Sequence, residues 1–285
     1  MPKHSSFQQR AQKVIAELRP IDNDFMQACV QAYPECVQSM LRVIMDMPQL
    51  VVPEPHAQHF LANHGKHSLT LDVFARDSQE RLINIETQVI SGGSSDASQH
   101  RARFHQALMD ARHLDESKPF KSLPDNWVIF IVDRDVLGYG LPIYRIERII
   151  TANGKPFGDG TRIIYVNCAI QDGSPLGSLA HDLLCAAPAK MRSQEWAYWS
   201  QSLKFGERKH TMSEVLERHL KEFENELRDE LRAEFYAEGR AEGRAEGLRD
   251  TVRKLVASGA ATPEAAARAL GLDVREVLNL AEQTE

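Results

Sequence analysis

Two carboxylates in a predicted β-hairpin have the clearest potential for chemistry. Apolar and polar residues alternate over residues 69–74 and again over 82–89, and the polar run ARDSQER separates the two segments. A period of two predicts two strands joined by a turn. If residues 76 and 82 close that turn, Asp72 lies directly opposite Glu86. A register shifted by one residue would put them on opposite faces, and the apolar pattern disfavours that shift.

Opposed carboxylates at this place predict a hard divalent metal ion. Two like charges facing each other across a hairpin repel by roughly a few tenths of a kcal/mol, and a bound cation makes the pair favourable. Mg²⁺ prefers one or two protein carboxylates and keeps other positions for water and phosphate oxygens. Asp72 and Glu86 would therefore hold Mg²⁺, or Mn²⁺, beside a phosphate and lower the pKa of an attacking water. The predicted reaction is hydrolysis of a phosphodiester.

Further polar residues surround this pair in the sequence. Gln88 shares the face of Glu86 and could hold a water or a phosphate oxygen, although it cannot act as a base. A Gly/Ser-rich loop follows, and the next helix begins with Arg101 and Arg103, whose guanidinium groups match phosphate oxygens. The alternatives are carboxylates on a solvent-facing strand and a helix with a solvated basic face.

Other groupings are weaker candidates for chemistry. Four histidines stand at steps of three to five residues without the carboxylate pattern of a zinc hydrolase: His56, His59, His64 and His67. The glycine-rich residues 154–160 lack the Gly-Lys-Ser/Thr ending of a phosphate loop and predict a hairpin turn. His181 and Asp182 precede apolar residues and are interpreted as a helix-start pair rather than as an acid–base dyad.

The elements that would position these residues follow from periodicity. Apolar residues recur at three- and four-residue steps over 22–47, interrupted at Pro34, which predicts two helices. Residues 48–68 show no clear period and are interpreted as a connector. The helix over 101–114 carries an apolar stripe that we expect to face the core: Phe104, Ala107, Leu108, Ala111 and Leu114.

Three apolar runs after that helix predict the remaining strands. The run Trp127–Val132 is continuous, as in a strand buried on both faces, and Ile143–Ile150 and Arg162–Cys168 are two more candidates. The order helix, hairpin, helix, strand predicts an α/β fold with a mixed sheet flanked by helices.

Composition limits the partners. No stretch approaches about 18 uninterrupted apolar residues, and the first residues lack the apolar run of a signal peptide, so we expect a cytosolic chain without a membrane span. The four cysteines form no metal-binding spacing and are expected to be reduced. The formal net charge of -6 argues against a protein that coats nucleic acid, so any contact with DNA is expected to be local.

The C-terminal part differs in kind, and three regions are expected: a catalytic domain over 1–205, a helical arm over 206–249 and a small tail over 250–285. The arm carries an apolar stripe on a highly charged helix, which predicts a coiled coil and a homodimer: Leu216, Leu220, Phe223, Leu227, Leu231 and Phe235. The repeat AEGRAEGRAEG then places glycines at four-residue steps, either for a close helix–helix contact or as a hinge.

The tail contains two helix starts, at Thr262 followed by Pro263 and at Asp273. This spacing suits a helix-turn-helix motif or a structural three-helix cap. The second helix is net acidic and offers only Arg275, which favours the structural cap over a DNA reader.

Several ordered motifs between residues 22 and 167 resemble the PD-(D/E)XK nuclease family transposases, relatives of recombination-promoting nucleases. They read LDVFARDSQERLINIETQVISGG, RARFHQALMDAR, LPDNWVIFIVDRDVLGYGLPIYRIERII and FGDGTRIIYVN. The resemblance implies a restriction-endonuclease-like core in which Asp72 is the motif aspartate and Glu86 the second carboxylate. Gln88 then stands where the broader superfamily places lysine. An acidic residue of the first helix would complete the metal site, with Asp24 as the candidate and Asp22 or Glu35 as alternatives.

The expected function is therefore that of a Mg²⁺-dependent DNA endonuclease, associated with recombination or mobile elements, which acts as a dimer. The competing hypothesis is a non-catalytic DNA-binding or assembly protein that keeps the nuclease core as a scaffold. RNA stays open as a substrate, because metal and carboxylates do not distinguish the two sugars.

Overall fold

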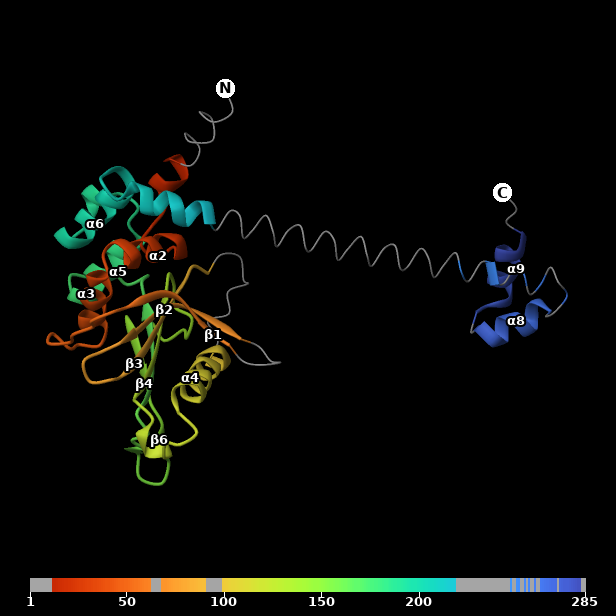
Figure 1. Ribbon diagram of the computed structural model, residues 1–285, viewed down its shortest axis with the longest axis horizontal. Coiled ribbons are helices and arrows are strands. Elements are labelled where there is room, and N and C mark those ends of the chain that lie inside the picture. The colour runs from red at the N-terminus through yellow and green to blue at the C-terminus, as the bar shows by residue number, and fades with distance from the viewer. Residues whose placement is uncertain are drawn as a thin grey trace. The chain divides into compact units, whose positions relative to one another are not determined.

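The computed structural model describes residues 12–62, 68–90 and 99–218, together with 262–270, 272–282 and isolated positions between 247 and 259. The chain divides into two compact units, Met1–His219 and Leu220–Glu285, and each is described by itself. The larger unit carries the sheet and the candidate site (Figure 1).

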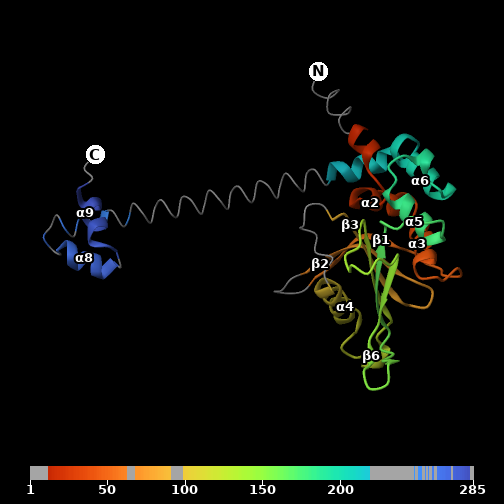
Figure 2. The same ribbon diagram turned by 180° about the vertical axis from the view of Figure 1, so that it is seen from behind.

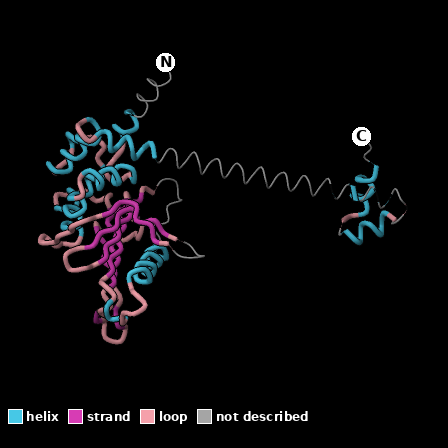
Figure 3. The backbone as a smooth tube through the Cα atoms, in the orientation of Figure 1, coloured by secondary structure: helices cyan, strands magenta, loops and turns pink. Residues whose placement is uncertain are grey.

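The larger unit is built on a six-stranded mixed sheet, which confirms the predicted α/β class (Figure 3). The strands lie in the order β1-β2-β3-β4-β8-β5, where β3, β4 and β8 run parallel and the other neighbours antiparallel. Their bounds are β1 His56–Leu61, β2 Leu69–Arg76, β3 Leu82–Gln88, β4 Asn126–Val132, β5 Ile143–Ile146 and β8 Thr161–Asn167.

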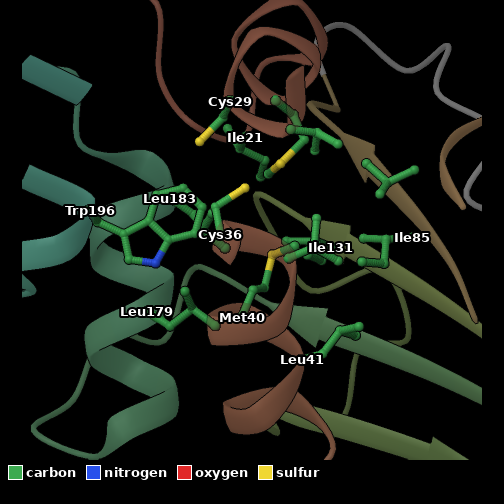
Figure 4. Packing of buried hydrophobic residues seen from close by; sticks show 14 of the residues in the cluster. Ile21, Cys29, Cys36, Met40, Leu41, Ile85, Ile131, Leu179, Leu183 and Trp196 are labelled. Carbon is green, nitrogen blue, oxygen red and sulfur yellow. The ribbon is translucent and has the colours of Figure 1, made fainter. Parts of the chain in front are cut away.

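Helices cover both faces of the sheet (Figures 1 and 2). One face is covered by α2 (Asn23–Ala32), α3 (Glu35–Ile44), α5 (Pro175–Leu184) and α6 (Gln194–Phe205), whose apolar residues form one core with the sheet. Figure 4 shows Cys36 and Met40 of α3 between Trp196 of α6 and Ile131 of β4, and all four belong to this core. The other face is covered by α4 (Gln99–His113), which packs on a second, smaller apolar cluster.

The predicted hairpin is present in the predicted register. Paired residues run from Arg76 opposite Leu82 to Val73 opposite Ile85, so the alternation of apolar residues was sufficient to fix the faces. The two predicted helices before it are also confirmed, with Pro34 between them at the start of α3.

One expectation about the elements around the hairpin was wrong, and a second holds only in part. The supposed connector contains strand β1, an edge strand whose periodicity is hidden because polar residues stand on both of its faces and Gln58 adopts a positive φ of 53°.

Helix α4 turns only part of the predicted stripe inward. Leu108 is buried and Phe104 packs against the apolar cluster, but Ala107 and Ala111 are exposed. Two polar residues are buried as well, because they find hydrogen-bond partners in the sheet. The buried residues of the helix are Ala102, His105, Gln106, Leu108 and Met109.

The predicted strand over 143–150 divides in two. Its first half is β5 of the main sheet, and its end is β6 (Ile149–Ile150), which pairs with β7 (Lys155–Pro156) in a separate two-stranded ribbon. A turn over 151–154 joins β6 and β7, with Gly154 at a φ of 69°. The glycine-rich segment therefore begins in a hairpin turn, as predicted.

The larger unit extends beyond residue 205, where the arm was expected to begin. Met212 and Val215 are buried in the same core as helices α2 to α6, so this stretch packs on the domain instead of projecting as an arm. Residues 219–246, which contain most of the predicted coiled coil and the first part of the glycine repeat, lie outside the described residues.

The smaller unit contains two described helices that begin at the predicted positions. They are α8 (Pro263–Leu270) and α9 (Val274–Glu282). The Thr262 hydroxyl accepts the Ala265 N–H at 3.3 Å, and the Asp273 carboxylate accepts the Arg275 N–H at 2.8 Å. A small apolar cluster joins the two helices: Ala266, Ala267 and Val277.

All four cysteines are free thiols, and three of them are buried. Within the part of the chain that the structure describes, none of the helices has both the length and the apolar character that crossing a bilayer requires.

A buried lysine joins the N-terminal segment to α6. Lys204 is only 5% exposed, and its ammonium donates to the backbone carbonyls of Ala16, Leu18 and Ala186. It also lies 5.6 Å from the centroid of the Phe25 ring. Three carbonyls from two segments, the N-terminal one and the one after α5, are thus satisfied by one side chain.

We expect the substitution Lys204→Met to destabilise the larger unit, because it leaves buried carbonyls without a donor. The loss should be at least about 2 kcal/mol, since each unsatisfied buried polar group costs about 1–3 kcal/mol. Urea denaturation followed by circular dichroism measures it. The exposed Lys209→Met is the matched control, and equal stability of the two variants would contradict this role for Lys204.

Candidate functional site

Asp72 and Glu86 lie beside each other where the pairing of β2 with β3 changes. The last printed backbone pair before this point is Val73 with Ile85. At the next step the two side chains take over: the Asp72 N–H donates to Glu86 Oε1 at 3.4 Å, and the Thr87 N–H donates to Asp72 Oδ2 at 3.0 Å. Each carboxylate therefore accepts a backbone N–H of the other strand, which fixes their relative position.

Glu86 is completely buried and is surrounded by polar groups from β3 and α4. Its Oε2 accepts a hydrogen bond from Arg101 Nη2 at 2.7 Å, and its Oε1 accepts one from Asn84 Nδ2 at 3.1 Å. His105 Nδ1 lies 3.6 Å from Oε1. Helix α4 thus supplies two side chains to the pair, four residues apart on one helix face.

Burial dominates the electrostatics of this group. It raises the pKa of Asp72 to about 6, against the hydrogen bond from Thr87 and the charge of Arg101. Burial and the neighbouring Asp72 raise the pKa of Glu86 to about 8, although Arg101 and Asn84 oppose the shift. Burial and Arg101 lower the pKa of His105 to about 4, so its ring is neutral near pH 7. One cation, Arg101, therefore faces two carboxyl groups.

The proton positions around His105 depend on the state of Glu86. Asn84 Nδ2 lies 2.9 Å from His105 Nδ1, and Arg101 Nε donates to His105 Nε2 at 3.3 Å. A neutral imidazole has one acceptor nitrogen, so it cannot accept from both. Among the described residues the buried Asn84 Oδ1 has no partner. Turning the Asn84 amide over lets Oδ1 accept from His105 Nδ1 and from a protonated Glu86, in agreement with the raised pKa of Glu86.

Gln88 and Arg103, the other residues predicted near the pair, lie in different surroundings. Gln88 is half-buried at the end of β3, two residues after Glu86 and thus on its side of the strand. Arg103 is exposed, and because successive helix residues are about 100° apart, it points away from Arg101. The structure therefore brings Arg101, and not Arg103, to the carboxylates.

The first helix does not complete a three-carboxylate group. Asp24 is partly exposed in the first turn of α2, which packs against β1 and β2. Of the alternatives, Asp22 forms an ion pair with Arg19 at 2.8 Å, and Glu35 is exposed in the first turn of α3. Across residues 12–62, 68–90 and 99–218, no three His, Cys, Asp or Glu side chains gather as a metal-binding group.

The sequence interpretation missed the roles of Asn84 and His105. Asn84 stands two residues before Glu86 on the same strand face, and His105 stands four residues after Arg101 on the same helix face. Both spacings were visible, but the expected apolar stripe of α4 directed attention to a different face. A polar residue that recurs with Arg101 at helical spacing was the available signal.

The weaker candidates serve structural roles among the described residues. His59 stacks on Phe74 with ring centroids 4.6 Å apart, while His64 and His67 lie outside the described residues. His181 and Asp182 lie in the last turn of α5, not at a helix start as expected. The buried Asp182 accepts the N–H groups of Arg192 and Ser193 at 2.7 and 2.8 Å, which holds the segment before α6.

Two carboxylates of raised pKa fit a divalent cation, which would favour their ionised forms. Asp72 and Glu86 are the residues that could hold it, and Asn84 and the Thr87 N–H orient them. Arg101 already stabilises negative charge at Glu86 and is the residue best placed to do so for a bound anion.

Comparisons of the chain with models of protein families, with curated proteins and with solved structures find no match. The site and the sequence motifs are therefore the basis for the function proposed for this chain.

We expect Glu86→Gln to stabilise the domain at high pH. A buried carboxyl with a folded-state pKa of about 8, above its ordinary value of 4.5, favours folding below pH 4.5 and loses that contribution as the pH rises through 8. The variant should melt higher than the wild type at pH 9, by at least about 2–4 °C, the change that 1 kcal/mol produces in a domain of this size. Thermal unfolding at pH 5 and pH 9 measures the difference.

The matched control for this substitution is Glu80→Gln, whose side chain is 71% exposed in the same hairpin. Added Mg²⁺ should raise the melting temperature of the wild type and of this control, but not that of Glu86→Gln. An identical dependence on pH in all three proteins would contradict the strained carboxyl pair.

Proposed function

We propose that this chain is a Mg²⁺-dependent DNA endonuclease that hydrolyses phosphodiester bonds, built on a restriction-endonuclease-like core and associated with recombination or mobile elements. One observation carries the proposal: the half-buried Asp72 and the buried Glu86 accept backbone N–H groups across the hairpin, with Arg101 bonded to Glu86. Burial raises the pKa values of both carboxyl groups, so holding them both ionised at this place costs free energy that a bound cation would offset.

The order of elements around the pair supports the same class. A helix, three antiparallel strands, the crossover helix α4 and the parallel strand β4 follow one another, and the two carboxylates stand on the second and third strands. The motifs that resemble PD-(D/E)XK nuclease family transposases contain these strands and the start of α4. The resemblance and the local chemistry thus point to the same residues by separate routes.

Each side chain has a distinct part in the proposed mechanism. Asp72 and Glu86 would hold Mg²⁺, or Mn²⁺, which would supply polarisation of the phosphate and a lower pKa for a water. Asn84 and the Thr87 N–H hold the two carboxylates in place, and Arg101 donates to a phosphate oxygen as negative charge develops. Gln88 orients the water or a phosphate oxygen through its amide. Asp24, which the resemblance implies as a third acidic residue, does not gather with the pair in the described residues and has no part in the mechanism proposed for them.

The proposed assembly is a homodimer joined through the C-terminal helices. Two active sites in one dimer can reach both strands of a duplex. The segment that would join the protomers lies mainly at 219–246, outside the described residues. This part of the proposal therefore rests on the apolar stripe that the sequence places on a highly charged helix.

A non-catalytic DNA-binding or assembly protein is the second candidate. Two observations favour it: glutamine stands at position 88 where the wider superfamily has lysine, and the described residues contain no group of three metal-ligating side chains. Cleavage by the purified protein separates the two candidates.

We expect the wild-type protein to nick or cut supercoiled plasmid with Mg²⁺ or Mn²⁺, and EDTA to abolish the reaction. Asp72→Asn and Glu86→Gln should each reduce cleavage to the background of buffer alone, because each removes one charge that would hold the cation. Glu80→Gln, in the same hairpin, should cleave like the wild type. Gel electrophoresis of the plasmid forms measures all four proteins, and equal cleavage by wild type and both site variants would place the activity elsewhere.

Arg101 and Arg103 should differ sharply on substitution. Arg101→Met is expected to slow cleavage by about 100-fold or more, the usual effect of losing one donor to a charge that develops in the transition state. Arg103→Met, on the other side of α4, should slow it by less than about threefold, since an exposed cation contributes mainly through screened attraction. Single-turnover cleavage rates measure both, and a larger loss for Arg103 would overturn the assigned role of Arg101.

A further inference from the structure

A row of aromatic residues leads sideways across the sheet from the carboxylate pair. Glu86 pairs with Phe130, Phe130 with Tyr165, and Tyr165 with Tyr144, on the neighbouring strands β3, β4, β8 and β5. The three aromatic residues belong to the cluster under α4, and the Phe130 and Tyr165 rings stack with centroids 5.1 Å apart. Three strand spacings of about 4.8 Å place Tyr144 about 14 Å from Glu86.

The last residue of this row fastens the loop that follows β4. The Tyr144 hydroxyl donates to the Asp135 carboxylate at 2.8 Å. That carboxylate also accepts the N–H groups of Leu137, Gly138 and Gly140 at 3.1, 2.8 and 2.7 Å. Burial acts against the charge, but the hydrogen bonds from Gly140 and Tyr144 lower the pKa of Asp135. The loop is therefore tied to an ionised carboxylate at neutral pH.

This loop presents an exposed aromatic ring. Tyr139 is 79% exposed and stands between Gly138 and Gly140, whose φ values of 79° and 70° favour glycine. The Tyr139 N–H donates to the Tyr144 hydroxyl at 3.2 Å, which fixes the backbone that carries the ring. The Tyr139 ring keeps its apolar surface exposed to water, although hydrogen bonds fix the backbone of the loop. Those hydrogen bonds therefore hold the ring at the surface instead of burying it.

The surroundings of Tyr139 indicate what could cover it. Arg134, on the same loop, has a side chain that is 57% exposed and whose Nε lies 3.5 Å from the Asp133 carboxylate, so it would contact a phosphate from a weakly held ion pair. Val136 and Leu137 pack against the cluster under α4, so the loop belongs to the sheet face that carries Glu86. An exposed aromatic ring near an exposed arginine is the combination that binds single-stranded nucleic acid, through stacking on bases and attraction of phosphates.

We propose that Tyr139 stacks on an unpaired base of the DNA strand whose phosphate lies at Asp72 and Glu86. This inference rests on the proposed nuclease function and names its substrate class: single-stranded DNA, or duplex DNA with splayed bases. The Tyr139 and Tyr144 ring centroids lie 6.2 Å apart. Together with the strand spacing of about 14 Å, this places the Tyr139 ring within about 20 Å of Glu86, which is about six base steps at the 3.4 Å rise of a duplex strand and fewer in an extended strand. The base that stacks therefore lies within about six nucleotides of the scissile phosphate.

Binding of a fluorescein-labelled single-stranded oligonucleotide tests the proposal without requiring cleavage. Fluorescence anisotropy in EDTA and in Ca²⁺ compares the full-length wild type with Tyr139→Ala, Tyr139→Trp and Phe120→Ala. Phe120 is a matched control, since it is 83% exposed on a separate 3₁₀ turn. We expect Tyr139→Ala to weaken binding roughly tenfold, as loss of one stacking platform does, and the other two variants to bind within about twofold of the wild type.

A second readout reports stacking directly. An oligonucleotide with 2-aminopurine at successive positions should lose fluorescence at one or two positions on binding wild type, and recover it with Tyr139→Ala. Because the Tyr139 ring is exposed, the melting temperature of the alanine variant should stay within about 2 °C of the wild type. Equal affinity and equal quenching for both proteins would overturn the inference, as would failure of the wild type to bind any single-stranded oligonucleotide.

The outcomes separate this inference from the proposed nuclease activity. If the wild type cleaves plasmid and Tyr139→Ala binds and quenches like it, the nuclease stands and the stacking site fails. If the wild type does not cleave but binds single strands through Tyr139, the stacking site stands and the nuclease fails. Loss of binding to a protein partner but not to DNA in Tyr139→Ala would identify a protein-docking loop and overturn the assignment to DNA.

Discussion

The burial of the Glu86 carboxyl next to Asp72 is the constraint on which the arrangement of this face of the sheet depends. A carboxyl with no exposure needs hydrogen-bond donors or a cation, and the neighbouring Asp72 makes that need greater. The donors to Glu86 are the Asp72 N–H across the hairpin, Asn84 from the same strand and Arg101 from α4. Helix α4 therefore turns Arg101 and His105 inward and leaves Ala107 and Ala111 of its predicted apolar stripe exposed.

The two faces of the sheet consequently differ in character. The face under α2, α3, α5 and α6 is a continuous apolar core, to which Met212 and Val215 also belong. The face under α4 combines a smaller apolar cluster with the buried polar group around Glu86. Apolar packing and the buried polar group thus lie largely on opposite faces, and the apolar face provides the rigid support on which the buried carboxyl pair can persist.

The sequence was sufficient for the hairpin and insufficient for its surroundings, for physical reasons that differ by element. The alternation around Asp72 and Glu86 fixed the register, because a slip by one residue would expose every apolar side chain. Strand β1 was not predicted, since an edge strand needs no apolar face and Gln58 breaks its period. The inward face of α4 was not predicted in full, because polar residues such as Gln106 are buried only where tertiary partners exist, here the Arg162 carbonyl. Residues 219–246, which hold most of the predicted coiled coil, lie outside the described part of the chain, so that prediction stays open.

Proton release on metal binding is the sharpest test of whether Asp72 and Glu86 form a cation site. Isothermal titration of the protein with Mn²⁺ at pH 7, in buffers of different ionisation enthalpy, measures both the affinity and the number of protons displaced. We expect Mn²⁺ to bind with release of about one proton, because a cation at Asp72 and Glu86 displaces the proton that Glu86 retains at pH 7 through its raised pKa. Binding without proton release, or identical binding by a protein carrying both Asp72→Asn and Glu86→Gln, would contradict it.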